Sequence, residues 1–430
     1  MTTLPADQRL DQPSAIRTPA KVLALCYVLP PALFPQAIQI GRLLAHSRHA
    51  IGRVSGPLGQ SGERGTTGDA LPRVIVPDTT VGWPRLHRAA LKLLPRYGSV
   101  PDDQRAWVAA AELAVVHSDA IAKFAPDVIV SFGEPMSDHL LGQNLKRRLS
   151  LPWIAHFSDP WADNPYRPRH KLSHRINRSL EAGVIATADR VIFTSEETRL
   201  LLARTYGQAL LAKSHVLPHS FEPALYAPKS TTSTDRITLR YLGNFYGIRR
   251  PYPLLEAIEI LRQRQPHLLG RLRFELIGGM PGWMKLHPLV RRADPDLIRI
   301  LPTVSYQASL DYMVSADMLL VIDAPAKTSV FLPSKLIDYI GAHRPIFGIV
   351  PPGTSARVIE AQGGMTADPS DPPAIADALA RIATDPPAIR AAAATGATSQ
   401  SDVYQATTVA ARFDALVTQL LTAGHTGTHL

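Results

Sequence analysis

The fold of this chain is decided by residues 328–350, which read TSVFLPSKLIDYIGAHRPIFGIV. The segment begins as a proline-containing loop, and Ser334 is a good helix cap. Apolar residues at helical spacing follow, with Lys335 and Asp338, three residues apart, on the polar face of the predicted helix. The apolar run 346–350 is typical of a buried parallel strand. This stretch therefore predicts one helix–strand step of a doubly wound α/β domain.

Length and composition limit the fold and the compartment. A chain of 430 residues is too long for one ordinary core, so we expect two domains of roughly 200 residues each. The single cysteine, Cys26, excludes an internal disulfide and a metal site built on several thiolates. No segment has the roughly 20 apolar residues of a membrane span, and the first residues are too polar for a signal peptide. We therefore expect a cytoplasmic protein.

The net charge of +10, with a sequence pI near 9.8, indicates anionic partners. Phosphorylated small molecules and anionic lipid headgroups fit this excess. Nucleic acid is not an expected partner, because no recognised nucleic-acid module occurs in the sequence. Residues 83–96 and 167–178 are basic and predict contact with an anionic membrane surface, on the inner face of the cell membrane. An ordinary solvated face is the alternative for both segments.

The first half of the chain predicts a parallel sheet with polar side chains at its carboxyl edge. Residues 21–29, 126–131 and 151–159 are the apolar runs that suggest its strands. Open α/β sheets bind ligands at the carboxyl ends of their strands. Glu134 and Trp161 follow two of these runs, and both are candidates for loops that line a cleft.

His156 and Asp159 lie at the end of the third run. The position of Asp159 at the carboxyl end of a strand favours a functional role. Strand alternation places His156 on the same face as Ser158, and a packed core histidine is the alternative to a catalytic one.

The second half repeats the α/β pattern after residues 223–236, a Pro-, Ser- and Thr-rich segment that we interpret as the interdomain hinge. Residues 237–242 predict a strand, and Gly243 opens the turn that follows it. Arg249 and Arg250 then precede the next predicted helix. A strand, a glycine turn, a basic pair and a helix form the usual arrangement of a phosphate site.

Lys335 and Asp338 suggest a second part of the same site. A lysine in the first turn of a helix favours a bound phosphate, because the unpaired N–H groups and the helix dipole attract anions there. A carboxylate one turn later can accept hydrogen bonds from a ribose. The alternative is a Lys–Asp pair on a solvated helix face.

Three stretches together resemble the retaining glycosyltransferase family 4, which has the GT-B architecture: residues 328–350, 243–251 and 151–161. The resemblance implies two doubly wound Rossmann-like domains that face a cleft. It divides the chain into an acceptor-side domain, the hinge and a nucleotide-sugar donor domain, at residues 1–222, 223–236 and 237–402. It also implies that a last helix, residues 403–421, packs back on the first domain.

The resemblance implies transfer of a sugar from a nucleotide-sugar donor with retention of configuration, in polysaccharide, glycolipid or cell-envelope glycan synthesis. Asp338 matches the ribose-binding acid, and Val330 stands where many members have a first glutamate. Asp159 matches the acid of the strand end that faces the bond being broken, whereas the usual histidine position holds Ser158 and His156 lies two residues earlier. The residues that match the donor diphosphate site are Gly243, Arg249, Arg250 and Lys335. No metal and no other cofactor is expected, because cationic side chains take the place of a metal.

The acceptor and the reaction leave alternatives open. We hypothesise a lipid-linked or membrane-presented acceptor, with a soluble sugar or glycan as the alternative. A nucleotide-sugar epimerase or hydrolase of the same architecture is a second interpretation, in which His156, Asp159 and His219 supply the acid and base. A catalytically inert nucleotide-sugar-binding protein is the third.

Overall fold

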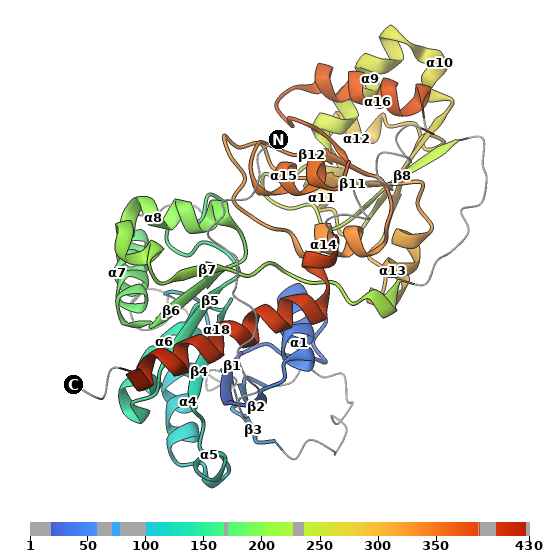
Figure 1. Ribbon diagram of the computed structural model, residues 1–430. Coiled ribbons are helices and arrows are strands. Elements are labelled where there is room, and N and C mark those ends of the chain that lie inside the picture. The colour runs from blue at the N-terminus through green and yellow to red at the C-terminus, as the bar shows by residue number, and fades with distance from the viewer. Residues whose placement is uncertain are drawn as a thin grey trace.

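The computed structural model describes residues 19–57, 71–77, 100–166, 171–226, 236–385, 387 and 401–426. These residues form two α/β domains, each built on a parallel sheet with helices packed against it (Figure 1). The strand orders are β3-β2-β1-β4-β5-β6-β7 in the first sheet and β10-β9-β8-β11-β12-β13 in the second. Both sheets are doubly wound, which confirms the predicted fold class.

The first domain has seven strands, and its central strands are buried on both faces because helices cover the sheet. Its strands are β1 (Lys21–Leu25), β2 (Ala50–Ser55), β3 (Arg73–Ile75), β4 (Val128–Gly133), β5 (Trp153–Phe157), β6 (Arg190–Phe193) and β7 (Ser214–Val216). Its helices are α1 (Pro35–His46), α4 (Trp107–Val116), α5 (Asp119–Phe124), α6 (Ser137–Leu149), α7 (Lys171–Thr187) and α8 (Glu196–Leu211).

The second domain begins after a short 3-10 helix, η2 (Pro223–Leu225). Its strands are β8 (Ile237–Leu242), β9 (Leu272–Ile277), β10 (Ile298–Leu301), β11 (Met318–Ile322), β12 (Ile346–Ile349) and β13 (Met365–Ala367). Its helices are α9 (Tyr252–Arg264), α10 (Pro266–Leu269), α11 (Gly282–Lys285), α12 (Pro288–Arg291), α13 (Tyr306–Val314), α14 (Ser334–Gly341), α15 (Thr354–Ala361) and α16 (Pro372–Thr384). Strands β7 and β8 thus lie on opposite sides of the predicted hinge, of which residues 227–235 lie outside the described residues.

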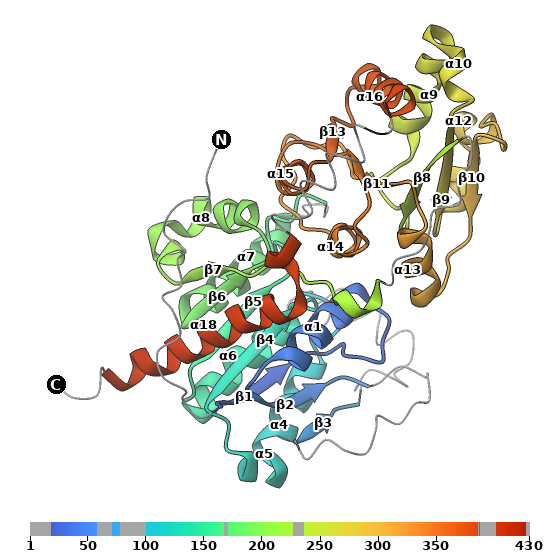
Figure 2. The ribbon, with the colours of Figure 1, turned by 45° about the vertical axis from the view of Figure 1, so that its right-hand side comes forward.

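The last described helix, α18 (Ala406–Thr426), follows a 3-10 turn, η3 (Ser401–Tyr404), and lies against the first domain beside α1 (Figure 2). Val409, Phe413 and Val417 are each at most 2% exposed and join the core around β1. Asp414 anchors the helix, because its carboxylate accepts hydrogen bonds from Ser47 Oγ at 2.6 Å and from Arg48 N at 2.9 Å.

The helix that decides the fold, α14, begins at the residue predicted to be its cap. Ser334 is its first residue, Pro333 holds the cap position, and no side chain caps the helix. The interpretation of Ser334 as the cap was therefore wrong. Asp338 is only 6% exposed. A solvated Lys–Asp face is thus wrong for this residue, because α1 of the first domain packs against α14.

Parts of the predicted membrane surface cannot be placed. Residues 83–96 and residues 167–170 lie outside the described residues. None of the helices in the described part of the chain could span a lipid bilayer.

Glu181 lies under the loop that follows β5 and makes stability depend on pH. The residue is 1% exposed, and its carboxylate accepts hydrogen bonds from Ala162 N at 3.2 Å and Tyr206 Oη at 2.8 Å. Burial raises the pKa of Glu181 from 4.5 to about 7. The folded state therefore holds this proton more tightly than the unfolded state, and the free energy of unfolding falls as pH rises between these two values.

Glu181→Gln is expected to be more stable than the wild type above pH 7, by at most about 3 kcal/mol, because it imitates the protonated acid. Thermal denaturation between pH 5 and pH 8 measures the difference, and the variant should show the flatter dependence. Glu259→Gln, at a half-exposed position on α9, is the control. Parallel curves for the wild type and Glu181→Gln would contradict the assignment.

Candidate functional site

The second sheet has a topological switch point between β8 and β11. The chain passes from β8 to β9 and β10 on one side, and β11 to β13 lie on the other. Open α/β sheets bind ligands in the crevice outside the carboxyl ends of the two strands at such a point. The loop 243–251 leaves β8 there, and Asp323 follows β11 directly. We refer to this place as the switch crevice.

Gly243 lies on the floor of the switch crevice. Its N–H donates to the carbonyl of Ile277 at 2.9 Å, which fixes the loop after β8 against the end of β9. Gly278 has a φ of +142°, and a Cβ atom there would lie 2.0 Å from the carbonyl oxygen of Gly243. Only glycine permits this close approach of two backbones. The backbones of the turns after β8 and β9 therefore pack directly against each other at this edge of the sheet.

Arg249 points into the switch crevice and is held there by Asp323. Its Nη2 donates to Asp323 Oδ1 at 3.0 Å, and its guanidinium lies 5.2 Å from the centre of the Tyr246 ring. Asp323 is 1% exposed, so this ion pair is shielded from water on one side. Nε of Arg249 is buried and has no hydrogen-bond partner among the described residues. That N–H is therefore an unsatisfied buried donor beside the ion pair, and such groups call for an explanation.

Lys335 is in the first turn of α14, as the sequence predicts. Its pKa is lowered to about 8, chiefly by burial; the charge of Asp338 opposes this shift and that of Arg249 adds to it. Lys335 is thus close enough to Arg249 and Asp338 for the charges of both residues to shift its pKa. Within the described part of the chain, Lys335 has no ion-pair partner. Arg249 and Lys335 therefore present two positive charges to the same crevice, and an anion there would satisfy both.

Arg250 turns away from this pair. Its Nε donates to the carbonyl of Gly247 at 2.9 Å, and its guanidinium lies over the rings of Trp283 and Tyr252, at 5.2 and 5.8 Å. The structure therefore brings Arg249 and Lys335 together but not Arg250. The predicted contact of Arg250 with a diphosphate stays a prediction.

The carboxylate of Asp338 is hydrogen-bonded to Arg42 of the first domain. Its Oδ1 accepts hydrogen bonds from Arg42 Nη1 at 2.9 Å and from Tyr226 Oη at 2.7 Å. Arg42, on α1, also donates to the carbonyl of Ser220 at 2.6 Å and to the hydroxyl of Tyr306. We call this group the interdomain latch. A ribose contact by Asp338 stays a prediction, and it would have to share the carboxylate with Arg42.

Arg42 was not predicted from the sequence to have a role. Helix α1 buries Gln36, Gln39 and Arg42, each at most 8% exposed. Their spacing of three residues places them on one helix face. A row of polar residues on one face, next to the apolar face, is the signal that could have revealed the interface between α1 and the second domain.

Tyr166 joins the loop after β5 to the donor side of the cleft. Its hydroxyl donates to Asp323 Oδ1 at 2.6 Å, and its ring stacks on Phe331 with the centroids 4.5 Å apart. The hydroxyls of Ser195 and Thr198 both donate to the carbonyl of Val330, at 2.5 and 2.8 Å. The loop before α14 is therefore held by the first domain at several points.

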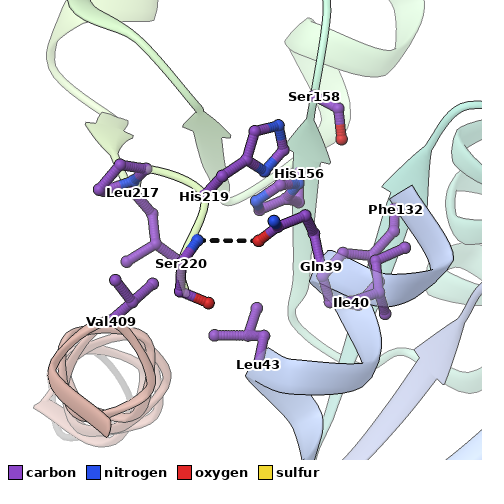
Figure 3. A pocket seen from close by; sticks show the side chains of 11 residues that line it. Gln39, Ile40, Leu43, Phe132, His156, Ser158, Leu217, His219, Ser220 and Val409 are labelled. Carbon is purple, nitrogen blue, oxygen red and sulfur yellow. Dashed lines mark hydrogen bonds between the residues drawn. The ribbon is translucent and has the colours of Figure 1, made fainter. Parts of the chain in front are cut away.

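His156 lines a small pocket at the carboxyl edge of the first sheet. Figure 3 shows the rings of His156 and His219 side by side, with Gln39 and Ser158 nearby. Burial lowers the pKa of His156 to about 4 and that of His219 to about 3, so both rings are neutral at pH 7. Nδ1 of His156 is buried without a hydrogen-bond partner in the described residues. A neutral imidazole with a free nitrogen can accept a proton.

The remaining predicted residues of the first domain are Asp159, Glu134 and Trp161. Asp159 and Glu134 lie at the ends of strands, and Trp161 lies in the core. Asp159 is half-buried just beyond β5, and Glu134 lines a second cavity at the end of β4 together with Tyr27 and Phe34. Trp161 is 2% exposed and packs in the core, where its Nε1 donates to Asn177 Oδ1 at 2.6 Å. The indole of Trp161 is thus packed under the loop, and its predicted place in a cleft loop stays a prediction.

The described residues contain no group of three His, Cys, Asp or Glu side chains that could hold a metal ion. The expectation that neither a metal nor another cofactor takes part stays a prediction.

Comparison with known proteins points to glycosyltransferases. Residues 69–218 match the model of a glycosyl transferase 4-like domain. The D-inositol 3-phosphate glycosyltransferase of Kribbella flavida is 26% identical over 254 residues, which are 53% of this chain and 59% of that protein. The chain therefore spans less than two thirds of the length of this relative.

Solved structures with the same fold cover nearly the whole chain. The sucrose-phosphate synthase of Thermosynechococcus elongatus superposes with a TM-score of 0.71 at 16% identity, over 94% of this chain and 100% of that one. Anabaena HepE, in complex with UDP and glucose, gives a TM-score of 0.65 at 12% identity, over 93% and 100% of the two chains. These likenesses confirm the two-domain GT-B fold.

Proposed function

We propose that the protein is a glycosyltransferase that transfers a sugar from a nucleotide-sugar donor. The observation that carries the proposal is the convergence of Arg249 and Lys335 in the switch crevice, where the Nε–H of Arg249 has no partner in the described residues. The glycosyl transferase 4-like match and the glycosyltransferase relative support the class of reaction. HepE, a neighbour in fold, was solved with UDP and glucose, which supports the class of donor.

In the proposed reaction the two cations hold the diphosphate of the donor. As the bond between the sugar and the diphosphate breaks, negative charge grows on the leaving oxygen, and a fixed pair of cations stabilises that charge. The acceptor hydroxyl attacks the sugar and loses its proton. His156 and Asp159, at the carboxyl end of β5, are our candidates to take that proton. Retention of configuration at the sugar is part of the proposal.

The acceptor and the location complete the proposal. We propose a lipid-linked or glycan acceptor in polysaccharide, glycolipid or cell-envelope glycan synthesis, used by an enzyme peripheral to the inner face of the cell membrane. The net charge of +10 supports an anionic surface as partner. The epimerase, hydrolase and inert-binding alternatives have less support, because both the matched domain and the relative are glycosyltransferases.

Two measurements test the proposal. Thermal shift with nucleoside diphosphates and their sugars identifies the donor, because a ligand at about a hundredfold above its Kd stabilises the folded state by roughly 2.7 kcal/mol. Labelled nucleotide sugar then distinguishes the reactions. Release of nucleotide only when an acceptor is present supports transfer, release without an acceptor indicates hydrolysis, and binding without turnover indicates an inert protein. The last two outcomes would contradict the proposal.

A further inference from the structure

The second domain exposes large apolar side chains beside the switch crevice. Trp283 is 51% exposed, Leu286 is 70% exposed and Ile248 is 49% exposed. We call these three residues the apolar patch. Exposed apolar residues scattered singly over a surface need no explanation, but neighbouring ones with a charged rim mark a site of interaction.

Arg250 connects the members of the apolar patch. Ile248 is at the tip of the tight turn formed by hydrogen bonds between Tyr246 and Arg249. Arg250 donates to the carbonyl of Gly247 in that turn, and its guanidinium lies 5.2 Å from the ring of Trp283. Trp283 and Leu286 are three residues apart at α11 and therefore share one helix face. Arg250 thus links the turn that carries Ile248 to the helix that carries Trp283 and Leu286.

The charge around the apolar patch is positive. Residues 244–252 and 282–292 contain five lysines and arginines and no aspartate or glutamate. Lys285, between Trp283 and Leu286, is exposed. A surface that combines tryptophan, leucine and isoleucine with cations is complementary to an anionic bilayer, in which apolar groups enter the interface and cations bind headgroups.

We propose that the apolar patch docks the second domain on an anionic lipid bilayer. The apolar patch contains none of the residues of the basic segments 83–96 and 167–178. Its turn leads directly to Arg249, which is paired with Asp323 at the crevice. Docking would therefore place the mouth of the crevice at the membrane surface. The inference does not depend on the glycosyltransferase proposal, because binding to vesicles requires no turnover.

Vesicle sedimentation of the full chain tests the proposal, with phosphatidylcholine vesicles that contain or lack phosphatidylglycerol. Trp283→Ser combined with Leu286→Ser is expected to lower the partition coefficient on anionic vesicles about tenfold or more. Lys285→Gln should lower it about fivefold and weaken its dependence on salt. Leu113→Ser removes a leucine that is 56% exposed on α4 of the first domain, and it should bind as the wild type does.

Three results would overturn the proposal. The first is an unchanged partition coefficient of the Trp283/Leu286 double variant, once circular dichroism has shown that it is folded. The second is a loss of nucleoside diphosphate affinity with unchanged partition, which would assign the apolar patch to the donor site. The third is a dimer in sedimentation velocity that the double variant dissociates, which would assign it to a second copy of the chain.

Discussion

Replacing Lys335 by alanine is expected to lower kcat/KM about a hundredfold or more, with little change in the melting temperature. The lysine is one of two cations in the switch crevice, and its charge is available because it has no ion-pair partner among the described residues. Loss of a fixed positive charge next to the leaving diphosphate removes stabilisation that is largest in the transition state. Lys335 is only partly buried, so its removal leaves no large cavity.

The pH dependence of the same reaction gives a sharper test. The pKa of Lys335 is lowered to about 8, chiefly by burial, so the free protein loses this charge as the pH rises through that value. The wild type should therefore show a fall in kcat/KM near pH 8. Lys335→Arg, which keeps its charge, should move that fall to higher pH.

Steady-state kinetics with the donor found by thermal shift measures both effects. Lys123→Ala, at an exposed site on α5 of the first domain, is the matched control and should behave as the wild type does. Turnover by Lys335→Ala at the wild-type rate would show that the donor site lies elsewhere.

The local features of the donor segment could be predicted from sequence, because they depend on neighbours along the chain. The apolar spacing of residues 334–341 defines the helix, and the run at 346–349 defines the strand that follows it. The topological rule for doubly wound sheets then predicts that the loop after β8 and the start of α14 meet. The convergence of Arg249 and Lys335 follows from these two regularities.

Other features of the candidate site depend on packing between distant segments, which the sequence does not show. Asp338 was assigned to a polar helix face, but its partner Arg42 is 296 residues away in the chain. Arg249 and Arg250 are adjacent in the chain, yet Arg249 pairs with Asp323 and Arg250 lies over the ring of Trp283. The spacing of residues along the chain does not predict this difference. Trp161 follows a strand in the same way as Glu134, yet α7 offers it a hydrogen-bond acceptor at Asn177 that draws it into the core.

The second large effect is expected at the interdomain latch. Arg42→Met should lower the free energy of unfolding by about 3–5 kcal/mol, because the Asp338 carboxylate would stay buried without its cation. Asp338→Leu alone should be similarly damaging. The double variant Arg42→Met with Asp338→Leu should recover most of the loss, since an apolar pair of similar volume can replace a buried ion pair.

Denaturant unfolding measures this cycle, and Arg48→Met, at the exposed end of the same segment, is the control.

The latch also predicts a functional difference between its two members. If Asp338 binds the ribose of the donor, Asp338→Asn weakens nucleoside diphosphate affinity while the double variant does not regain it. If Asp338 serves only to hold the domains together, the affinity follows stability and returns in the double variant. Additive losses of stability in the cycle would show that Arg42 and Asp338 do not act as a pair.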